Sequence, residues 1–236
     1  MKWIADPTKR FPKRPFFTEE EIDFECEKIL SEYFNNSRGN AGLILPIPTN
    51  ELTRLIEADA GDLDLYADLE HAEGPGVEGV TEFKPGQEPL VKIEQTLSSD
   101  NRRINRLRST LAHELFHVKF HQALWQLLWA GKRRTASKTK GAACHRDTII
   151  NAQRTDWLEW QAAYGAGAFL LPRTNLFAEW NELSVGLSRP TDLTIQAGDV
   201  VARVAQRYEV STEAATVRLK QLGLLPRVGV STSQRA

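Results

Sequence analysis

Cysteine is scarce in this sequence of 236 residues, and so are long apolar runs. The two cysteines, Cys26 and Cys144, lie far apart in the chain. Small secreted domains usually carry several closely spaced cysteine pairs, so this content favours a reducing compartment, and we expect a cytoplasmic protein. No stretch reaches the roughly 18 consecutive apolar residues of a membrane-spanning helix, so we expect no membrane association.

The N-terminal stretch MKWIADPTKRFPKRPFF is basic, but it is interrupted by prolines and lacks the apolar segment of a secretory signal peptide. Hydrophobic residues make up 41% of the chain, which is enough for a globular core. The length allows one large domain, or one domain with an appendage.

The net charge of -1 conceals a strong segregation of charge along the chain. Residues 50–100 carry thirteen acidic side chains against three basic ones, whereas residues 131–154 carry seven basic side chains against one acidic. Residues 201–236 carry six basic side chains against two acidic. Either these faces are solvated and compensate one another, or the basic segments contact nucleic acid or an acidic partner.

The pattern along the chain predicts three parts. Residues 1–44 form an N-terminal arm with an amphipathic helix over 18–34, which begins at a capping box of Thr18 and Glu21 and carries Cys26 on its apolar face. Residues 45–185 form the main α+β domain with a small antiparallel sheet. Residues 186–236 form a C-terminal region with helix-turn-helix proportions and a disordered tail.

Within the main part, a short helix begins near residue 49, with Asn50 or Thr49 as its cap. Strands are expected over 77–83 and 89–97 because apolar and polar residues alternate there. A long helix over 101–128 follows, and a second helix over 156–171 ends at Pro172.

The stretch RSTLAHELFHVKFH, residues 108–121, holds three of the five histidines of the chain. His113 and His117 are one helical turn plus about 40° apart, so both imidazoles project from one side of the helix and can bind one metal ion. Glu114 lies where a carboxylate can reach a water molecule on that metal. This is the H-E-x-x-H pattern of zinc hydrolases. His121 lies about 80° around the helix from His113 and is expected to be a surface or neighbouring residue rather than a ligand.

A third ligand must come from another part of the chain, and Glu159 is the best candidate. It precedes several small residues in EWQAAYGAGAFLLP, which would let its helix approach the histidine-bearing helix closely. Asp156 and Asp147 are weaker alternatives, and a salt-bridged Glu159 in a core helix is the non-functional alternative.

These two segments resemble the ImmA/IrrE family of zinc metallopeptidases, which pairs H-E-L-G-H on one helix with E-x-x-A-N-x-F-A-x-x-L-L-x-P on a second. The resemblance covers about residues 45–225 and implies a zincin-like fold. It implies that His113, His117 and Glu159 bind Zn²⁺ and that Glu114 is the general base. It also implies a protein substrate, a helix-turn-helix repressor whose cleavage derepresses stress, mobile-element or toxin–antitoxin genes.

The sequence departs from the family pattern at several positions. Phe116 stands where glycine is common, and Gly165 stands where an aromatic residue is common. We expect the large side chain of Phe116 on one helix to fill the space left by Gly165 on the other. Ala163 replaces the usual asparagine and Phe169 replaces the first leucine, which puts the shape of the substrate pocket in doubt.

A peptidase also needs a donor that stabilises the tetrahedral oxyanion. Tyr164 and His145 are the candidates, against a core tyrosine and a solvated loop histidine. Cys144 could bind the metal and inhibit the enzyme, although a buried role is the simpler interpretation. By zincin architecture, the strand around Val91–Glu94 would offer its edge to an extended peptide.

Two other functions stay open at this point. The C-terminal helices have helix-turn-helix proportions, with Ser211 or Thr212 as a cap and with charge from Arg218 and Lys220, so they predict either packing or DNA contact. Together with the basic segment 131–154, they would suit a non-catalytic regulatory or defence protein with structural zinc. A zinc hydrolase acting on a non-peptide bond is the third possibility.

Overall fold

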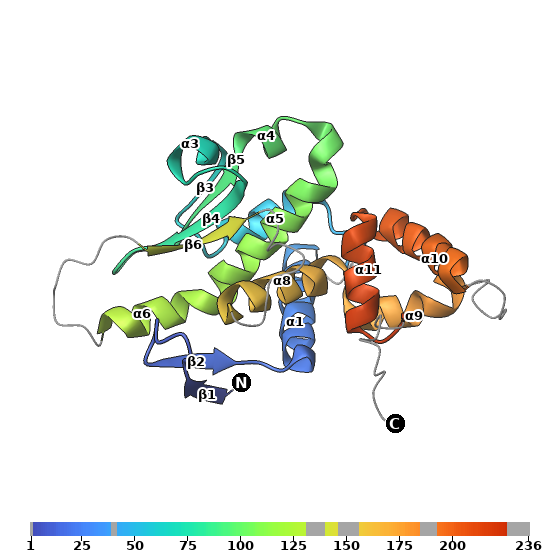
Figure 1. The fold of residues 1–236 in the computed structure, drawn as a ribbon, viewed down its shortest axis with the longest axis horizontal. Helices are drawn as coiled ribbons and strands as arrows, with labels where there is room; N and C mark the ends of the chain where they lie inside the picture. The colour runs from blue at the N-terminus through green and yellow to red at the C-terminus, as the bar shows by residue number, and fades with distance from the viewer. Residues whose placement is uncertain (1, 39–41, 131–139, 146–155, 185–192, 226–236) are drawn as a thin grey trace, which may run out of the picture.

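The protein is a mixed α+β fold in which helices surround one face of a small sheet (Figure 1). The structure, a computed structural model, describes residues 2–38, 42–130, 140–145, 156–184 and 193–225. The elements in chain order are β1 Lys2–Ala5, β2 Lys13–Phe16, α1 Glu19–Arg38, α2 Thr49–Glu57, β3 Asp62–Ala67, α3 Leu69–Ala72, β4 Val77–Phe83, β5 Leu90–Glu94, α4 Gln95–Ser98, η1 Asn101–Arg103, α5 Ile104–Phe116, η2 His117–His121, α6 Gln122–Ala130, β6 Lys140–His145, α8 Trp157–Leu170, α9 Arg173–Leu183, α10 Leu193–Tyr208 and α11 Thr212–Gln221.

The main sheet has four strands in the order β3-β5-β4-β6. β4 pairs antiparallel with β5 and β6, whereas β3 and β5 run parallel. The expected small antiparallel sheet is present in β5, β4 and β6, and β3, a strand that the sequence pattern did not reveal, adds a parallel neighbour to β5. Leu63 and Leu65 alternate with acidic residues along β3, and the acidic composition of this region masked the alternation.

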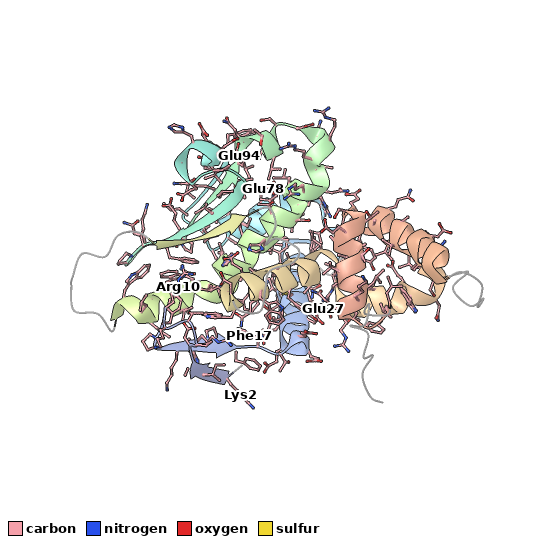
Figure 2. All side chains as sticks on the ribbon, in the orientation of Figure 1. Lys2, Arg10, Phe17, Glu27, Glu78 and Glu94 are labelled. Carbon is pink, nitrogen blue, oxygen red and sulfur yellow. The ribbon has the colours of Figure 1, made fainter. Side chains whose placement is uncertain are left out.

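The N-terminal arm is an ordered part of the molecule. β1 and β2 form an antiparallel hairpin in which Trp3 pairs with Pro15. The predicted capping box of α1 is confirmed, since the Thr18 backbone N–H donates to Glu21 Oε2 (3.0 Å) and the Glu21 N–H donates to Thr18 Oγ1 (3.2 Å). Glu27 of α1, labelled in Figure 2, accepts hydrogen bonds from Thr174 at the start of α9.

The predicted long helix over 101–128 is divided into segments. It begins as a short 3₁₀ turn, continues as α5, and widens into a π-helical turn over His117–His121 before α6. Short π-helical segments are rare, and they occur frequently at functional sites. His117 and His121 lie at the two ends of this one, with their ring centroids 4.9 Å apart.

Helices α5 and α8 lie against each other because small residues of α8 leave room for large ones of α5. A Cβ atom added to Gly165 would lie only 1.9 Å from Cδ2 of Phe116. The expected packing of Phe116 into the space left by Gly165 is confirmed. Cys26 of α1 is fully buried beside them, with its Sγ 4.0 Å from the Gly165 carbonyl oxygen, as expected for a core residue.

One continuous core joins the three parts that the sequence suggested. Its buried residues come from α1, α2, β5, α5, α8, α10 and α11, among other elements. Two buried arginines reinforce it. Arg108 of α5 donates to the carbonyl oxygens of Ile47, Tyr208 and Glu209, and Arg218 of α11 donates to the carboxylate of Asp23.

In the C-terminal helices, at least one charged side chain is buried and forms an ion pair inside the protein. Arg218 was expected to add charge to an exposed helix face, but its side chain is only 1% exposed and faces α1. The expected cap is confirmed at Ser211, whose Oγ accepts from the Ala214 N–H (3.0 Å).

Helix α2 begins after Pro48 without a side-chain cap, so the expected cap at Thr49 or Asn50 is wrong.

Among the described helices, none combines the length and the apolar character needed to cross a lipid bilayer.

Candidate metal centre

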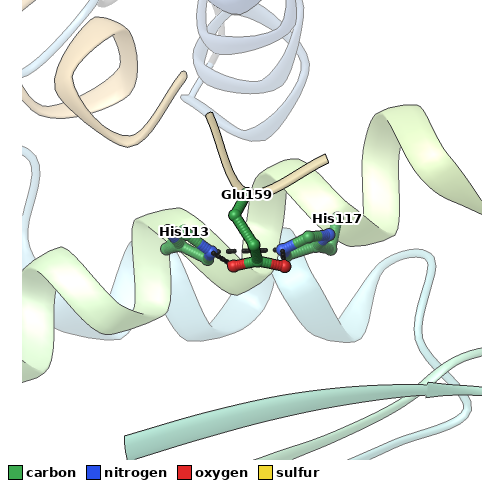
Figure 3. A group of neighbouring side chains, drawn as sticks. All are labelled: His113, His117 and Glu159. Atoms are coloured by element: carbon green, nitrogen blue, oxygen red, sulfur yellow. Dashed lines mark hydrogen bonds and ion pairs between the residues drawn. The ribbon is translucent and has the colours of Figure 1, made fainter. Parts of the chain in front are cut away.

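Two histidines of the α5–η2 helix and one glutamate of α8 form a buried cluster (Figure 3). His113 Nε2 lies 3.1 Å from His117 Nε2 and 3.1 Å from Glu159 Oε2. His117 Nε2 lies 3.5 Å from Glu159 Oε1. Both histidines are completely buried and Glu159 is 6% exposed, so the predicted group of three is brought together inside the protein.

The distances within this cluster fit a tetrahedral metal ion. Zinc binds histidine nitrogen and carboxylate oxygen at about 2.0–2.1 Å, so two ligand atoms on one tetrahedral ion lie about 3.3 Å apart. The three observed separations, 3.1, 3.1 and 3.5 Å, lie around this value. Two imidazoles and one carboxylate leave a fourth position of the tetrahedron open, as in catalytic rather than structural zinc sites.

Glu159 reaches the histidines because α8 lies so close to α5. Burial alone would raise the pKa of Glu159, but the electrostatic influence of the two histidines and the hydrogen bond with His113 outweigh it, so the pKa is lowered. Glu159 is thus held as a carboxylate. Of the two alternatives, Asp156 is exposed at the N-terminus of α8, and Asp147 lies outside the described residues.

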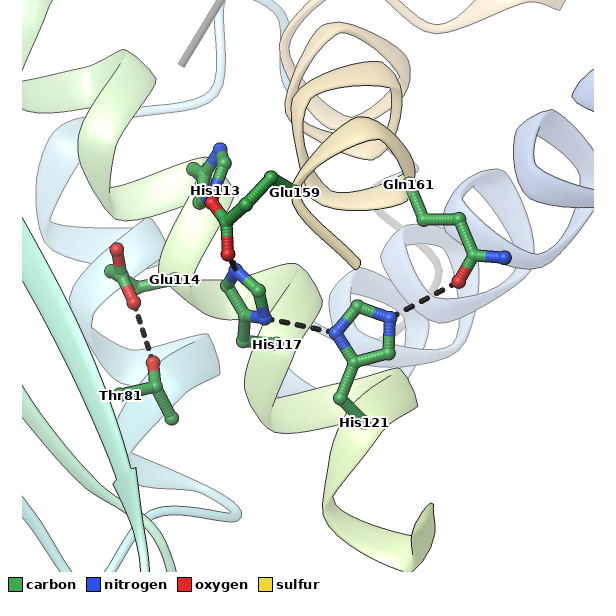
Figure 4. A network of polar contacts seen from close by, with 7 residues as sticks. All are labelled: Thr81, His113, Glu114, His117, His121, Glu159 and Gln161. Carbon is green, nitrogen blue, oxygen red and sulfur yellow. Dashed lines mark hydrogen bonds and ion pairs between the residues drawn. The ribbon is translucent and has the colours of Figure 1, made fainter. Parts of the chain in front are cut away.

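Glu114 points from the same helix toward the sheet and is completely buried (Figure 4). Its Oε2 accepts a hydrogen bond of 2.6 Å from Thr81 Oγ1 on β4. Gly79, two residues earlier on the same face of β4, is equally close, since a Cβ atom there would lie 2.5 Å from Glu114 Oε1. The strand thus fixes the carboxylate from one side. Sequence reasoning missed Thr81, although the spacing Gly79-x-Thr81 on one strand face was a usable signal.

His121 is completely buried and not on the helix surface. Its Nδ1 lies 2.8 Å from His117 Nδ1, and its Nε2 lies 3.1 Å from Gln161 Oε1 (Figure 4). Burial lowers the pKa of His121 well below 6.5, and the neighbouring His117 adds to this, so the ring is neutral at physiological pH. His121 therefore contacts a candidate ligand without belonging to the cluster, and Gln161 is a second residue that sequence reasoning missed.

The two candidate oxyanion donors fare differently. Tyr164 is buried in the core, where its hydroxyl donates to Asp23 Oδ2 (3.1 Å) and its ring packs under Arg218. Burial raises the pKa of this hydroxyl. Since it is engaged with α1, we withdraw Tyr164 as a catalytic candidate. The side chains of His145 and Cys144 lie outside the described part of the structure, so His145 stays a prediction.

The strand beside the site is also different from the one expected. β5, which contains Val91–Glu94, has β3 on one side and β4 on the other, so it has no free edge for a peptide. The strand that contacts Glu114 is β4, through Thr81, and β4 lies between β5 and β6. The expectation that β5 would offer its edge to a substrate is therefore wrong.

The comparison with known families agrees with this geometry. Residues 96–220, just over half of the chain, match the model of the peptidase M78 family, the IrrE N-terminal-like domain. The chain belongs to this family. The match contains the whole cluster and Glu114, and it supports a peptidase. The chain matches no curated protein and no solved structure.

Proposed function

We propose that this member of the peptidase M78 family is a zinc-dependent endopeptidase that cleaves a specific protein. The observation that carries the proposal is the buried cluster of His113, His117 and Glu159, whose spacing suits a tetrahedral ion with one open position. Glu114 follows the first histidine directly and is anchored by Thr81. Burying four polar side chains has a cost in stability, which binding of a metal ion would help to offset.

His113, His117 and Glu159 would hold the ion through Nε2, Nε2 and a carboxylate oxygen. When bound, zinc would polarise the scissile carbonyl group and make a water molecule acidic enough to attack it at neutral pH. Glu114 would accept the proton of that water and then deliver it to the leaving amine. Thr81 would hold one carboxylate oxygen of Glu114 and so orient the group.

For the substrate, we propose a helix-turn-helix transcriptional repressor, as the family resemblance suggests, with cleavage relieving repression of stress, mobile-element or toxin–antitoxin genes. Contact with nucleic acid through residues 131–154 and the C-terminal helices is a further proposal. The burial of Arg218 removes one cation from that surface and favours the peptidase over a non-catalytic DNA-binding protein.

The first experiment measures zinc content by mass spectrometry in wild type, His113→Ala and Glu159→Ala, with Glu57→Ala as a control on the exposed end of α2. We expect about one zinc per chain in wild type and in the control, and loss in both cluster variants. A wild type that takes up no zinc after incubation with it would remove the basis of the proposal.

The second experiment tests the chemistry. The zinc-loaded protein and its Glu114→Gln variant are incubated with purified helix-turn-helix repressors from the same organism, and fragments are identified by mass spectrometry. We expect a single cut by the wild type and none by the variant, although the variant should keep its zinc. Equal cleavage by both proteins would contradict the role of Glu114, and no cleavage by either would contradict the proposed substrate.

A further inference from the structure

A chain of hydrogen bonds leads from the N-terminal hairpin to the proposed ligand His117, and Figure 4 shows its part from Gln161 to His117. Gln161 Nε2 donates to the Pro15 carbonyl oxygen (3.2 Å). Gln161 Oε1 lies 3.1 Å from His121 Nε2, and His121 Nδ1 lies 2.8 Å from His117 Nδ1. The three side chains are at most 1% exposed, so water does not compete for these bonds.

The direction of every bond in this chain follows from its first member. A carbonyl oxygen can only accept, so the Gln161 atom that faces Pro15 is the amide nitrogen. The other end of the amide is then an oxygen, which also accepts, so His121 must carry its proton on Nε2. The His121 ring is completely buried, and its two nitrogens face an amide oxygen and another imidazole rather than a carboxylate, so it is the neutral form, with one proton, that fits this site. His121 Nδ1 is therefore an acceptor, and the proton of His117 lies on Nδ1.

This assignment leaves His117 Nε2 with a free lone pair, which is the form that binds a metal. His113 lacks such a partner, because its Nδ1 forms no hydrogen bond with any described residue. Its Nε2 instead lies 3.1 Å from the Glu159 carboxylate, which favours a proton on that nitrogen before metal binds. The two histidines of the cluster are thus prepared differently.

We infer that His121 and Gln161 are positioning residues that fix the metal-binding tautomer and ring orientation of His117, and that the N-terminal hairpin anchors them through the Pro15 carbonyl. This inference rests on the proposed function for the identity of the metal. It adds that a segment outside the family match of residues 96–220 supports the metal centre. Partners of metal-binding histidines typically affect metal affinity 10- to 100-fold.

The test uses the full chain in three forms: wild type, Gln161→Met and His121→Phe. Methionine and phenylalanine keep roughly the volume of the original side chains and remove the hydrogen bonds. Gln126→Met, on the exposed face of α6, is the matched control for a glutamine that has no part in the chain. Circular dichroism shows whether each variant is folded, and Gln161→Met remains usable if the phenylalanine does not fit.

The first readout is the tautomer of His117, obtained from ¹⁵N chemical shifts of the histidine rings in the metal-free protein. We expect the Nδ1–H form alone in wild type and in Gln126→Met, and a mixture of both forms in Gln161→Met. A purely structural role for Gln161 would leave this spectrum unchanged. An Nε2–H form of His117 in the wild type would overturn the inference.

The second readout is zinc affinity, measured by competition with a coloured chelator. We expect Gln161→Met and His121→Phe to bind zinc roughly 10- to 100-fold more weakly than wild type and the control. Unchanged affinity in both folded variants would also overturn the inference. A different result would contradict the proposed function alone. In that case the wild type binds zinc and shows the expected tautomer, but Glu114→Gln does not reduce cleavage. If the wild type binds no zinc, the tautomer readout still decides the inference.

Discussion

The ring of Phe116 occupies the space in which a side chain at position 165 would lie. A Cβ atom on Gly165 would meet Cδ2, Cε2 and Cγ of that ring at 1.9, 2.5 and 2.7 Å. These contacts are far shorter than any tolerated in a packed core, and both residues belong to helices that carry the candidate metal ligands. The pair therefore sets the distance between α5 and α8, and with it the reach of Glu159.

This relationship predicts that Gly165→Ala destabilises the protein by about 1–3 kcal/mol, the usual range for overpacking a core. The same substitution in a Phe116→Ala background should cost nothing further, because the ring is gone. The measurement is a double-mutant cycle from urea unfolding. Additive effects at the two positions would contradict the shared space.

A matched control is present two residues further along α8. A Cβ atom on Gly167 would lie 3.4 Å from its nearest neighbour, the flexible Arg218 side chain, which is an ordinary contact. Gly167→Ala should therefore leave stability unchanged or raise it by up to about 1 kcal/mol through helix propensity. A loss equal to that of Gly165→Ala would show that α8 tolerates no added methyl group anywhere.

Thr81 is expected to control activity through Glu114. Thr81→Val removes the hydroxyl that donates to Glu114 Oε2 while keeping the shape of the side chain. We expect turnover to fall about tenfold, since a positioned general base contributes 10²–10⁴-fold in total, and zinc content to stay the same. Thr53→Val, which removes a hydroxyl that bonds only to the Asn50 carbonyl, is the control. Unchanged turnover in Thr81→Val would show that β4 does not position the base.

The sequence predicted the parts of the site that depend on local periodicity. His113, Glu114 and His117 share a short helical segment, so their arrangement follows from the helix repeat. Glu159 required a second helix, and the run of small residues after it indicated the close approach that the structure shows. The packing of Phe116 against Gly165 was also predictable. Both residues depart from the family pattern, and the volume gained at one position equals roughly the volume lost at the other.

The features that escaped prediction depend on contacts between distant segments. Thr81 and Gln161 are ordinary residues in sequence, and only the packing of β4 and the hairpin against the helices gives them partners. His121 was expected either at the surface or beside a ligand, and only the packing of α8, which brings Gln161 against it, decides for the second role. Helix α9 was missed because its residues show no clear apolar stripe, and most of its side chains are exposed or half-buried.

Glu159 should make the stability of the metal-free protein depend on pH. Its pKa in the folded state lies below the usual 4.5, so it contributes stability that is fully present above that value and is lost as the pH falls toward the folded pKa. Wild type should therefore lose stability between about pH 5 and pH 3 more steeply than Glu159→Gln. Urea unfolding over this range is the measurement. Glu57→Gln, at an exposed position, should follow wild type, and an equal slope in Glu159→Gln would contradict the assignment.

The buried pair of Arg218 and Asp23 should decide whether α11 stays attached to α1. Arg218 Nη2 donates to Asp23 Oδ1 at 2.6 Å, and the two side chains are 1% and 4% exposed. Removing one partner leaves an uncompensated buried charge, so Arg218→Met should destabilise the protein by about 3–5 kcal/mol.

The double variant Arg218→Met/Asp23→Leu should recover much of this loss, because neither charge is then left without its partner. Arg203→Met, a half-buried arginine of α10 that donates to the Leu183 carbonyl oxygen, serves as the comparison and should cost less. Thermal unfolding followed by circular dichroism gives the four values. If Arg218→Met is as stable as wild type but loses affinity for DNA, the arginine serves a nucleic-acid surface and the packing role assigned to it is wrong.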